Sequence, residues 1–282
     1  MVDDFDEFIS AQKRLELNGL ADSPLNIAYT DVGTGDPIIL LHGIPTWSYL
    51  YHEVIPILEP YGRVIAPDFL GHGYSDKRDK FDRSLLSQTQ MILKFMDSLG
   101  LEKASIVGHD TGGGVALIMA VEYSERIKKL VLSNIVAYDS WPIDDMIDLG
   151  NPSWRSKSAS EIAEFVALGL PDGLYNSDRL TPEFKKNIVA PYATEEGKIS
   201  LIRNASALNT NHTMMIAHRH KDIDLPTLIL WGVHDPWQSI NDGEKLAHEI
   251  PNATLVRLEN ASHWLQQDTP KEFANEVIKF LS

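Results

Sequence analysis

The sequence predicts an α/β fold in which a mostly parallel sheet is flanked by helices and interrupted by one helical insertion. Short apolar runs rich in β-branched residues alternate with longer amphipathic stretches, which is the pattern of parallel strands separated by helices. The apolar runs are nearly continuous, as expected for strands buried on both faces. With 282 residues, 43% of them hydrophobic, the chain is long enough to form an α/β domain around a sizeable core.

The individual strands are predicted from these apolar runs and their breaks. Near the start, residues 14–19 and 26–33 alternate apolar and polar side chains and predict an antiparallel edge of the sheet. Helical patterns at 85–100 and 111–125 separate three of the later strands. The strands of the main sheet are predicted, in chain order, at 37–43, 63–69, 104–110, 128–134, 226–232 and 253–260.

One long interior stretch has no strand pattern. We expect residues 136–223 to form a helical cap, and residues 1–135 and 224–282 to form the core from which it projects. The stretch contains helical segments broken by proline and glycine, and its many apolar residues argue against disorder. The last helix of the core is predicted to begin at Pro270, with Thr269 as the N-cap of a capping box.

Composition limits the function. The net charge of −15 argues against binding to nucleic acid or anionic membranes, and the absence of cysteine excludes disulfides and thiolate catalysis. The first residues lack the pattern of a signal peptide. His218 and His220 have no evident third metal ligand. We expect a cytoplasmic monomer or homodimer that acts on a small molecule and water, without a cofactor or metal.

The chemistry is indicated first by the sequence Gly108-His-Asp110-Thr-Gly112. It matches the nucleophile-elbow pattern G-x-nucleophile-x-G and lies between a predicted strand and a predicted helix. The glycines fit this interpretation because bulk beside a strained elbow residue would collide with the turning chain. On this motif alone, an aspartate capping a helix beside a glycine-rich turn is an alternative.

Three further segments favour the elbow. Asp235 follows one predicted strand and His263 follows the next, so the chain order is nucleophile, acid, histidine. The turn containing Ile44 follows the first parallel strand. Its backbone N–H can pair with that of Thr111 to form an oxyanion hole facing Asp110.

These segments resemble the α/β-hydrolase branch that contains haloalkane dehalogenases and epoxide hydrolases. The resemblance implies an α/β-hydrolase fold, with the insertion as the helical cap of that branch. It also implies that Asp110 is the nucleophile, His263 the base and Asp235 its acid partner, and it places Ile44 and Thr111 at the oxyanion positions. The resemblance is carried by HGIPTWSYLY (42–51), RVIAPDFLGHGYSDK (63–77) and VGHDTGGG (107–114).

An aspartate nucleophile favours alkyl carbon over acyl carbon. Attack on an acyl carbon would give an anhydride no more stable than the ester consumed, whereas attack on an sp³ carbon gives an ordinary alkyl ester. Water activated by His263 then attacks the carboxyl carbon of Asp110. The amides of Ile44 and Thr111 should face the oxyanion that forms there.

The leaving group is less constrained, because two positions depart from the dehalogenase pattern. Thr111 stands where a tryptophan commonly follows the nucleophile, and Ile44 stands where relatives carry a polar side chain. A halide without N–H donors would be poorly stabilised. An epoxide oxygen instead needs an acid, and three tyrosines of the insertion are the candidates: Tyr138, Tyr175 and Tyr192.

The sequence therefore predicts a cofactor-free hydrolase that forms a covalent aspartyl ester, with a small apolar epoxide as the favoured substrate. The alternatives are a haloalkane dehalogenase, an ester or lactone hydrolase that uses Asp110 as a general base, and a ligand-binding pseudo-hydrolase. The intact set of Asp110, Asp235 and His263 argues against a pure binder. Indole side chains are candidates to line the substrate cavity, with packing as the alternative role: Trp47, Trp141, Trp237 and Trp264.

Overall fold

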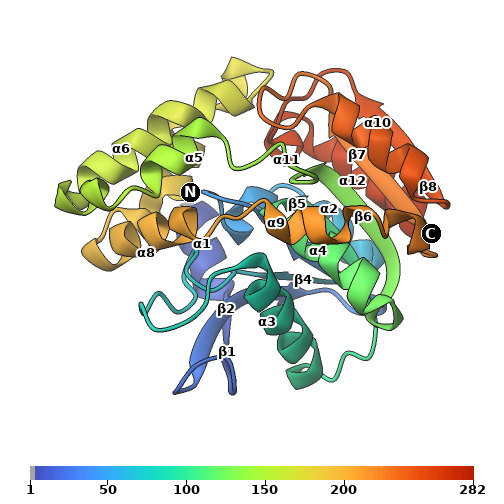
Figure 1. Cartoon of the computed structure of the whole chain (residues 1–282), viewed down its shortest axis with the longest axis horizontal. Coiled ribbons are helices and arrows are strands. Elements are labelled where there is room, and N and C mark those ends of the chain that lie inside the picture. The colour runs from blue at the N-terminus through green and yellow to red at the C-terminus, as the bar shows by residue number, and fades with distance from the viewer. Residues whose placement is uncertain (1–3) are drawn as a thin grey trace.

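The computed structural model describes residues 4–282 and contains an eight-stranded sheet (Figure 1). The strands are β1 (Lys13–Leu17), β2 (Leu25–Val32), β3 (Pro37–Leu41), β4 (Arg63–Pro67), β5 (Ala104–Asp110), β6 (Ile127–Ile135), β7 (Thr227–Gly232) and β8 (Ala253–Leu258). Their spatial order is β1-β2-β4-β3-β5-β6-β7-β8. Strand β2 is antiparallel to both of its neighbours, and all other pairs are parallel. The predicted α/β fold, with its antiparallel edge, is confirmed.

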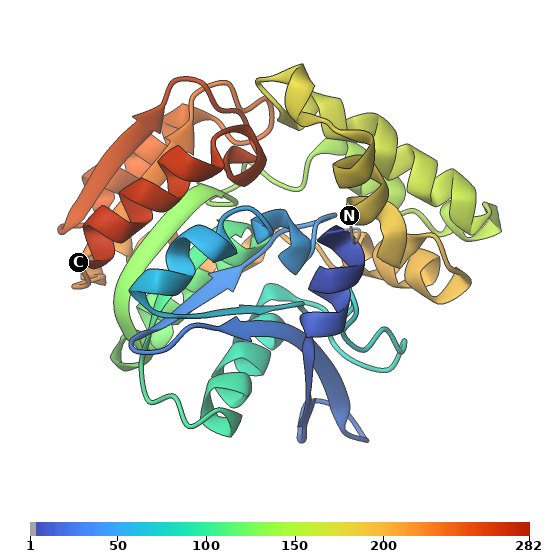
Figure 2. The same ribbon diagram turned by 180° about the vertical axis from the view of Figure 1, so that it is seen from behind.

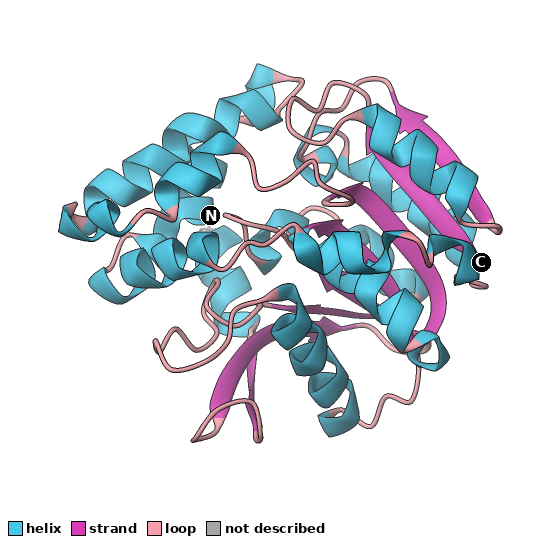
Figure 3. Cartoon of the chain, in the orientation of Figure 1, coloured by secondary structure: helices cyan, strands magenta, loops and turns pink. Residues whose placement is uncertain are grey.

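Helices cover both faces of this sheet (Figures 1 and 3). Successive residues of a strand point to opposite faces, so Ile39 and Leu41 of β3 join one apolar layer and Ile38 and Leu40 join the other. The first layer includes α3, α4 and α10, and the second includes α2 and α12, which lie in front of the sheet in Figure 2. The helices of the core are α1 (Asp4–Ala11), α2 (Ile55–Leu58), α3 (Leu85–Ser98), α4 (Thr111–Glu122), α10 (Ile240–Glu249), α11 (Leu265–Asp268) and α12 (Pro270–Leu281).

Between β6 and β7 the described chain contains helices and turns but no strand. The longer segments are α5 (Asp144–Leu149), α6 (Ala159–Gly169), α7 (Pro182–Val189), α8 (Glu195–Ser206) and α9 (Asn211–Ala217). Buried side chains from α5, α6 and α8 form an apolar cluster that also includes Ile44 of the core. The insertion therefore packs on the turn that follows β3. Its division from the core at residues 136 and 223 stays a prediction.

The N-terminus of the last helix differs in detail from the sequence prediction. Helix α12 begins at Pro270 as expected, but Thr269 makes no side-chain capping bond. Because α11 ends one residue earlier, the Thr269 hydroxyl donates back to the carbonyl of Leu265, at 3.4 Å. The predicted capping box is therefore wrong at this helix. One is present instead at the start of α6, between Ser158 and Glu161. None of the helices in residues 4–282 is long and apolar enough to cross a membrane.

Candidate active site

The site is centred on Asp110, at the junction of β5 and α4. Its backbone has φ 51° and ψ −123°, a conformation that a residue with a Cβ adopts only under strain. The flanking glycines allow the chain to turn this tightly. A Cβ on Gly108 would lie 2.7 Å from the carbonyl oxygen of Gly112, and one on Gly112 would lie 2.4 Å from that of His42. The result is a carboxylate presented at the end of a central strand.

One oxygen of this carboxylate lies against backbone N–H groups. The amide of Ile44 donates to Asp110 Oδ1 at 2.8 Å, and the amide of Thr111 also lowers the pKa of the carboxyl by hydrogen bonding. Glycine at position 43 makes this approach possible, because a Cβ there would lie 2.2 Å from Oδ1. The two amides thus bracket the carboxyl group of Asp110 itself, which is the arrangement expected of an oxyanion hole for that carbon.

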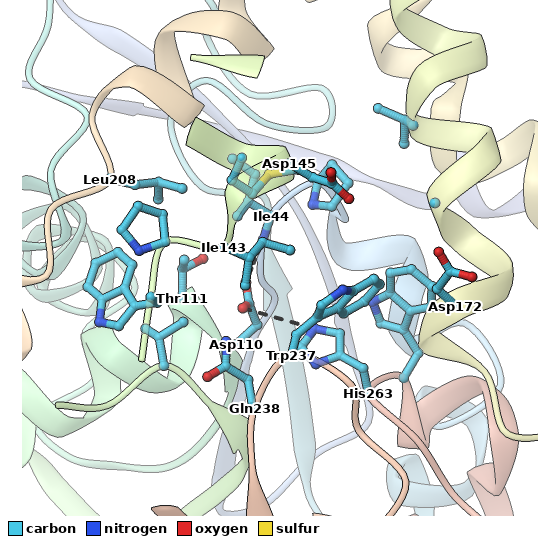
Figure 4. A pocket seen from close by; sticks show the side chains of 18 of the residues that line it. Ile44, Asp110, Thr111, Ile143, Asp145, Asp172, Leu208, Trp237, Gln238 and His263 are labelled. Atoms are coloured by element: carbon cyan, nitrogen blue, oxygen red, sulfur yellow. Dashed lines mark hydrogen bonds and ion pairs between the residues drawn. The ribbon is translucent and has the colours of Figure 1, made fainter. Parts of the chain in front are cut away.

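The other carboxylate oxygen faces His263 (Figure 4). His263 Nε2 lies 4.0 Å from Asp110 Oδ2, too far for a direct hydrogen bond. On its other side, His263 Nδ1 lies 2.8 Å from Asp235 Oδ2. The bond to the carboxylate assigns the proton to Nδ1 in the neutral ring, which leaves the lone pair of Nε2 directed toward Asp110.

Asp235 is itself held by three N–H groups. Its Oδ1 accepts from the backbone amides of Trp237 at 2.8 Å and Gln238 at 2.9 Å, and its Oδ2 accepts from Asn134 Nδ2 at 2.6 Å. Asn134 lies near the end of β6 with φ 40° and also accepts from the amide of Gly232. Asn134 was not among the site residues predicted from the sequence. The available signal was an asparagine, a residue that tolerates positive φ, at the end of a central strand.

Burial and charge shift the pKa values of the two facing groups. Burial raises the pKa of Asp110, although His263 and the amides of Thr111 and Ile44 favour the ionised carboxylate. For His263, burial alone would lower the pKa, but the charges of Asp235 and Asp110 together raise it above the ordinary histidine value. Each of the two groups therefore keeps its proton to a higher pH than it would in solution.

A cavity of about 310 Å³ opens above these residues. Asp110, Thr111 and His263 are buried at its floor, whereas Asp145 and Asp172 of the insertion are exposed at its rim. The walls are mostly apolar. The complete lining consists of Ile44, Pro45, Asp110, Thr111, Val136, Trp141, Pro142, Ile143, Asp145, Met146, Phe165, Val166, Leu168, Gly169, Asp172, Leu208, Trp237, Gln238, His263 and Trp264.

The three candidate tyrosines do not line this cavity. The Tyr138 hydroxyl donates to Glu249 at 2.7 Å, and that of Tyr192 lies 3.4 Å from the carbonyl oxygen of Thr46. Tyr175 is half exposed and stacks on His234. Each side chain instead contacts a residue that is distant in sequence and does not line the cavity. The expectation that these tyrosines contact substrate is corrected.

Of the four tryptophans predicted to line the cavity, three do so and Trp47 does not. Trp47 is fully buried beside α7, donates its indole N–H to the carbonyl of Asn187 and is absent from the cavity wall, which corrects the prediction for it. Trp141 lines the cavity, with its N–H bonded to Thr213 at 2.8 Å. Trp237 and Trp264 also line it and contact each other edge to face, with ring centroids 5.3 Å apart.

The lining offers side-chain hydrogen-bond donors from Trp237 and Trp264, which were predicted to line it, and from Gln238, which was not. Trp264 Nε1 is buried and has no partner among the described residues. The side-chain nitrogens of Trp237 and Gln238 likewise make no hydrogen bond to any residue that the structure describes. Gln238 had no signal of its own, because its position follows from the turn whose amides bind Asp235. Within residues 4–282, no group of three or more His, Asp or Glu side chains is arranged to hold a metal ion.

The chain is similar in sequence to two named enzymes and in structure to a protein with the alpha/beta hydrolase fold. The chain is 30% identical over 265 residues to haloalkane dehalogenase 2 of Mycobacterium tuberculosis (strain ATCC 25618 / H37Rv), covering 90% of each chain. It is 27% identical over 275 residues to cis-3-alkyl-4-alkyloxetan-2-one decarboxylase of Shewanella oneidensis, covering 90% and 84%. An alpha/beta hydrolase fold protein from Burkholderia ambifaria superimposes with a TM-score of 0.87 at 25% identity, covering 95% and 97%.

A family model described as the alpha/beta hydrolase fold matches residues 36–270. That span contains strands β3 to β8, the whole insertion, and the segments that carry Asp110, Asp235 and His263. The chain therefore belongs to the alpha/beta hydrolase fold family and is a hydrolase of that fold.

Proposed function

We propose that the protein hydrolyses a small, uncharged or cationic alkyl electrophile through an ester formed on Asp110, and that its leaving group is a halide. The observation that carries the proposal is the orientation of the Asp110 carboxylate. Its Oδ1 is held by the Ile44 amide at 2.8 Å while Oδ2 faces His263 Nε2. This orientation supports attack of water on the carboxyl carbon of the side chain, rather than on a substrate carbonyl, because the Ile44 amide faces the carboxyl oxygen.

The first step is an in-line displacement. Oδ2 of Asp110 forms a bond to the sp³ carbon as the carbon–halogen bond breaks, and the halide leaves with the bonding electrons. The product is an alkyl ester of Asp110, whose carbonyl oxygen remains on the amides of Ile44 and Thr111. No proton moves in this step, so a halide needs hydrogen-bond donors but no acid.

The second step consumes water. His263 Nε2 takes a proton from a water molecule that attacks the carboxyl carbon, and the resulting oxyanion is stabilised by the two amides. Collapse of this intermediate releases the alcohol, which leaves with a proton from the imidazolium. Asp235 stabilises the imidazolium in between, because its Oδ2 lies 2.8 Å from Nδ1.

The cavity lining favours a halide over an epoxide. In the described chain, Thr111 is the single hydroxyl in the lining, and an alcohol is far too weak an acid to protonate an alkoxide. The tyrosines that would have served as acids lie elsewhere. Indole and amide N–H groups from Trp237, Gln238 and Trp264 are the donors that a halide requires. The 30% identical relative is named a haloalkane dehalogenase, which agrees with this choice.

Trapping the ester tests the mechanism. In a His263→Gln variant, alkylation by bromohexane should proceed while hydrolysis stalls, so that intact-mass analysis shows one hexyl adduct and peptide mapping places it on Asp110. His248→Gln is the matched control, because His248 is exposed on α10 and does not line the cavity, and it should turn over without an adduct. Turnover by the wild-type protein without an adduct in the variant would indicate general-base hydrolysis.

Substrate competition tests the leaving group. Halide release from dibromoethane is measured beside diol formation from styrene oxide and hydrolysis of an aryl ester. We expect halide release to be fastest. Faster diol formation would make an epoxide the favoured substrate. The absence of any turnover would favour a ligand-binding protein with the same fold.

A further inference from the structure

The cavity has an uneven distribution of charge. Its floor holds the buried Asp110 and His263, whereas its exposed rim carries Asp145 from α5 and Asp172 from the 3₁₀ turn Leu170–Gly173. The lining contains no lysine or arginine. Any ligand that reaches from floor to rim therefore meets carboxylates at its outer end.

The two rim carboxylates are not neutralised by the protein. The carboxylates of Asp145 and Asp172 form no hydrogen bond or ion pair with another described residue. Among the other surface carboxylates of the insertion, Asp148 accepts from Trp154 and Glu161 pairs with Lys157, whereas Asp144 and Glu164 also have no partner in the described chain but do not line the cavity. Figure 4 shows Asp145 and Asp172 set apart from Asp110 and Gln238, on the insertion side of the cavity.

Asp172 also lies beside two indole rings. The next residue, Gly173, accepts a hydrogen bond from the backbone of Trp264, and a Cβ on it would lie 2.6 Å from that ring and 2.8 Å from the ring of Trp237. Close packing thus fixes the chain at Asp172 against both aromatic side chains. Both rings also line the cavity, so aromatic surface lies beside Asp172 within it. Carboxylates next to aromatic faces are the surroundings that organic cations prefer.

We propose that the rim of this cavity is a subsite for an organic cation, so that the preferred substrates carry an alkylammonium group at the end remote from the reacting carbon. Asp145 and Asp172 attract the ammonium group, and Trp237 and Trp264 offer ring surface to its methyl or methylene groups. Anionic substrates are repelled by the same carboxylates. The assignment of the reacting carbon rests on the proposed function, whereas binding of the cation does not.

Binding of unreactive ligands tests the subsite without any turnover. Hexyltrimethylammonium, heptanol and heptanoate are titrated by calorimetry, with tryptophan fluorescence as a second signal. We expect the ammonium to bind most tightly and heptanoate at least about tenfold more weakly at low ionic strength. Raising the salt concentration to about 500 mM should reduce the difference in affinity between hexyltrimethylammonium and heptanoate, because exposed charges are screened.

Two single variants and one control test which carboxylates bind the ammonium group. Asp145→Asn and Asp172→Asn should each weaken binding of the ammonium by about threefold and leave heptanol unchanged. Asp144→Asn is the matched control. It removes the same charge from the neighbouring exposed position of α5, which does not line the cavity, and should change nothing. Equal binding of heptanol and the ammonium by the wild-type protein, or an equal effect of Asp144→Asn, would overturn the proposal.

Turnover of a matched series then separates the two proposals. Bromohexane, 6-bromohexyltrimethylammonium and 6-bromohexanoate share a reacting carbon and differ at the far end. We expect kcat/KM to be highest for the ammonium compound, lower for bromohexane and lowest for the carboxylate. In a double Asp145→Asn, Asp172→Asn variant we expect the three values to become similar. Turnover of bromohexane without this order would refute the subsite alone. Ammonium binding that depends on Asp145 and Asp172, without halide release from any member, would refute the proposed function alone.

Discussion

Asn134 Nδ2 lies 2.6 Å from Asp235 Oδ2, the same oxygen that lies 2.8 Å from His263 Nδ1. One carboxylate oxygen therefore serves both an asparagine on β6 and the histidine that follows β8. Asn134 is also bonded to the amide of Gly232 at the end of β7. The side chain joins the ends of two adjacent strands and orients the acid between them.

We predict that Asn134→Ala slows hydrolysis of the ester more than its formation. Loss of the N–H lets Asp235 rotate, so His263 is less well oriented for the water step, and we expect this step to slow by about tenfold to a hundredfold. Rapid-quench measurement of halide burst and steady-state rates separates the two steps. Asn187→Ala is the control, because it removes a buried asparagine bonded to Tyr49 instead, and it should lower stability without a selective effect on hydrolysis.

A second prediction concerns the close approach of Gly43 and Asp110. In Gly43→Ala the new Cβ would lie 2.2 Å from Oδ1 and would push the carboxylate off the Ile44 amide. We expect kcat to fall by at least about a hundredfold, the cost of losing an oxyanion-hole donor. Asp110→Ala should lose all turnover while it remains folded. Because the Cβ of Asp110 would itself lie 2.4 Å from the new Cβ, the clash is absent only when residue 110 is glycine. The melting temperature lost in Gly43→Ala should therefore be recovered in the double variant Gly43→Ala, Asp110→Gly when it is compared with Asp110→Gly alone; no recovery would contradict this account of the glycine.

A third prediction follows from the raised pKa of His263. Water activation needs the neutral imidazole, so kcat should fall as the pH drops through this pKa. The charge of Asp235 raises this pKa both before and after Asp110 becomes an uncharged ester, so the pH of the acidic limb should depend on Asp235. Asp235→Asn should move this limb to lower pH and lower the plateau. If Asp235→Asn leaves the pH of the acidic limb unchanged, a group other than His263 controls that limb.

The raised pKa of His263 also makes the stability of the fold depend on pH. Because the folded pKa of His263 lies above the unfolded value, its charged form stabilises the fold fully below the unfolded pKa, and this contribution is lost as the pH rises through the folded pKa. A His263→Gln variant should lack that part of the pH dependence. Urea unfolding of both proteins on either side of neutral pH measures it.

A fourth prediction separates the two kinds of tryptophan. Trp264→Phe removes an indole N–H that has no partner in the described chain, so it should slow chloride displacement more than iodide displacement, because the poorer leaving group depends more on a donor. Trp47→Phe is the matched control. It breaks the bond to Asn187 outside the cavity and should cost about 1 kcal/mol of stability without altering the ratio of chloride to iodide rates. Equal ratios in both variants would exclude Trp264 from leaving-group stabilisation.

The positions of the strands along the chain and the tight turn at Asp110 could be predicted from the sequence because they depend on local patterns. Short apolar runs specify the buried strands β3 to β8, which are five to nine residues long, and the glycines beside Asp110 allow a turn that other residues would block. The positions of Asp235 and His263 after successive strands follow from the same pattern. In a parallel sheet, residues after the carboxyl ends of strands meet at one edge, so the chain order alone brings these groups to the same end.

Only the tertiary structure decided which side chains of the irregular segments reach the cavity. Tyr138, Tyr175 and Tyr192 belong to the insertion like Asp145, yet their hydroxyls or rings are held by Glu249, His234 and Thr46 while the carboxylate of Asp145 faces the rim. Such directions depend on packing between residues distant in sequence, and no periodicity encodes them. Asn134 is a further case, since its bond to Asp235 exists only once β6 and β7 are paired. Gln238 is placed by the local turn in which its amide binds Asp235, but only the tertiary structure brings that turn to the cavity.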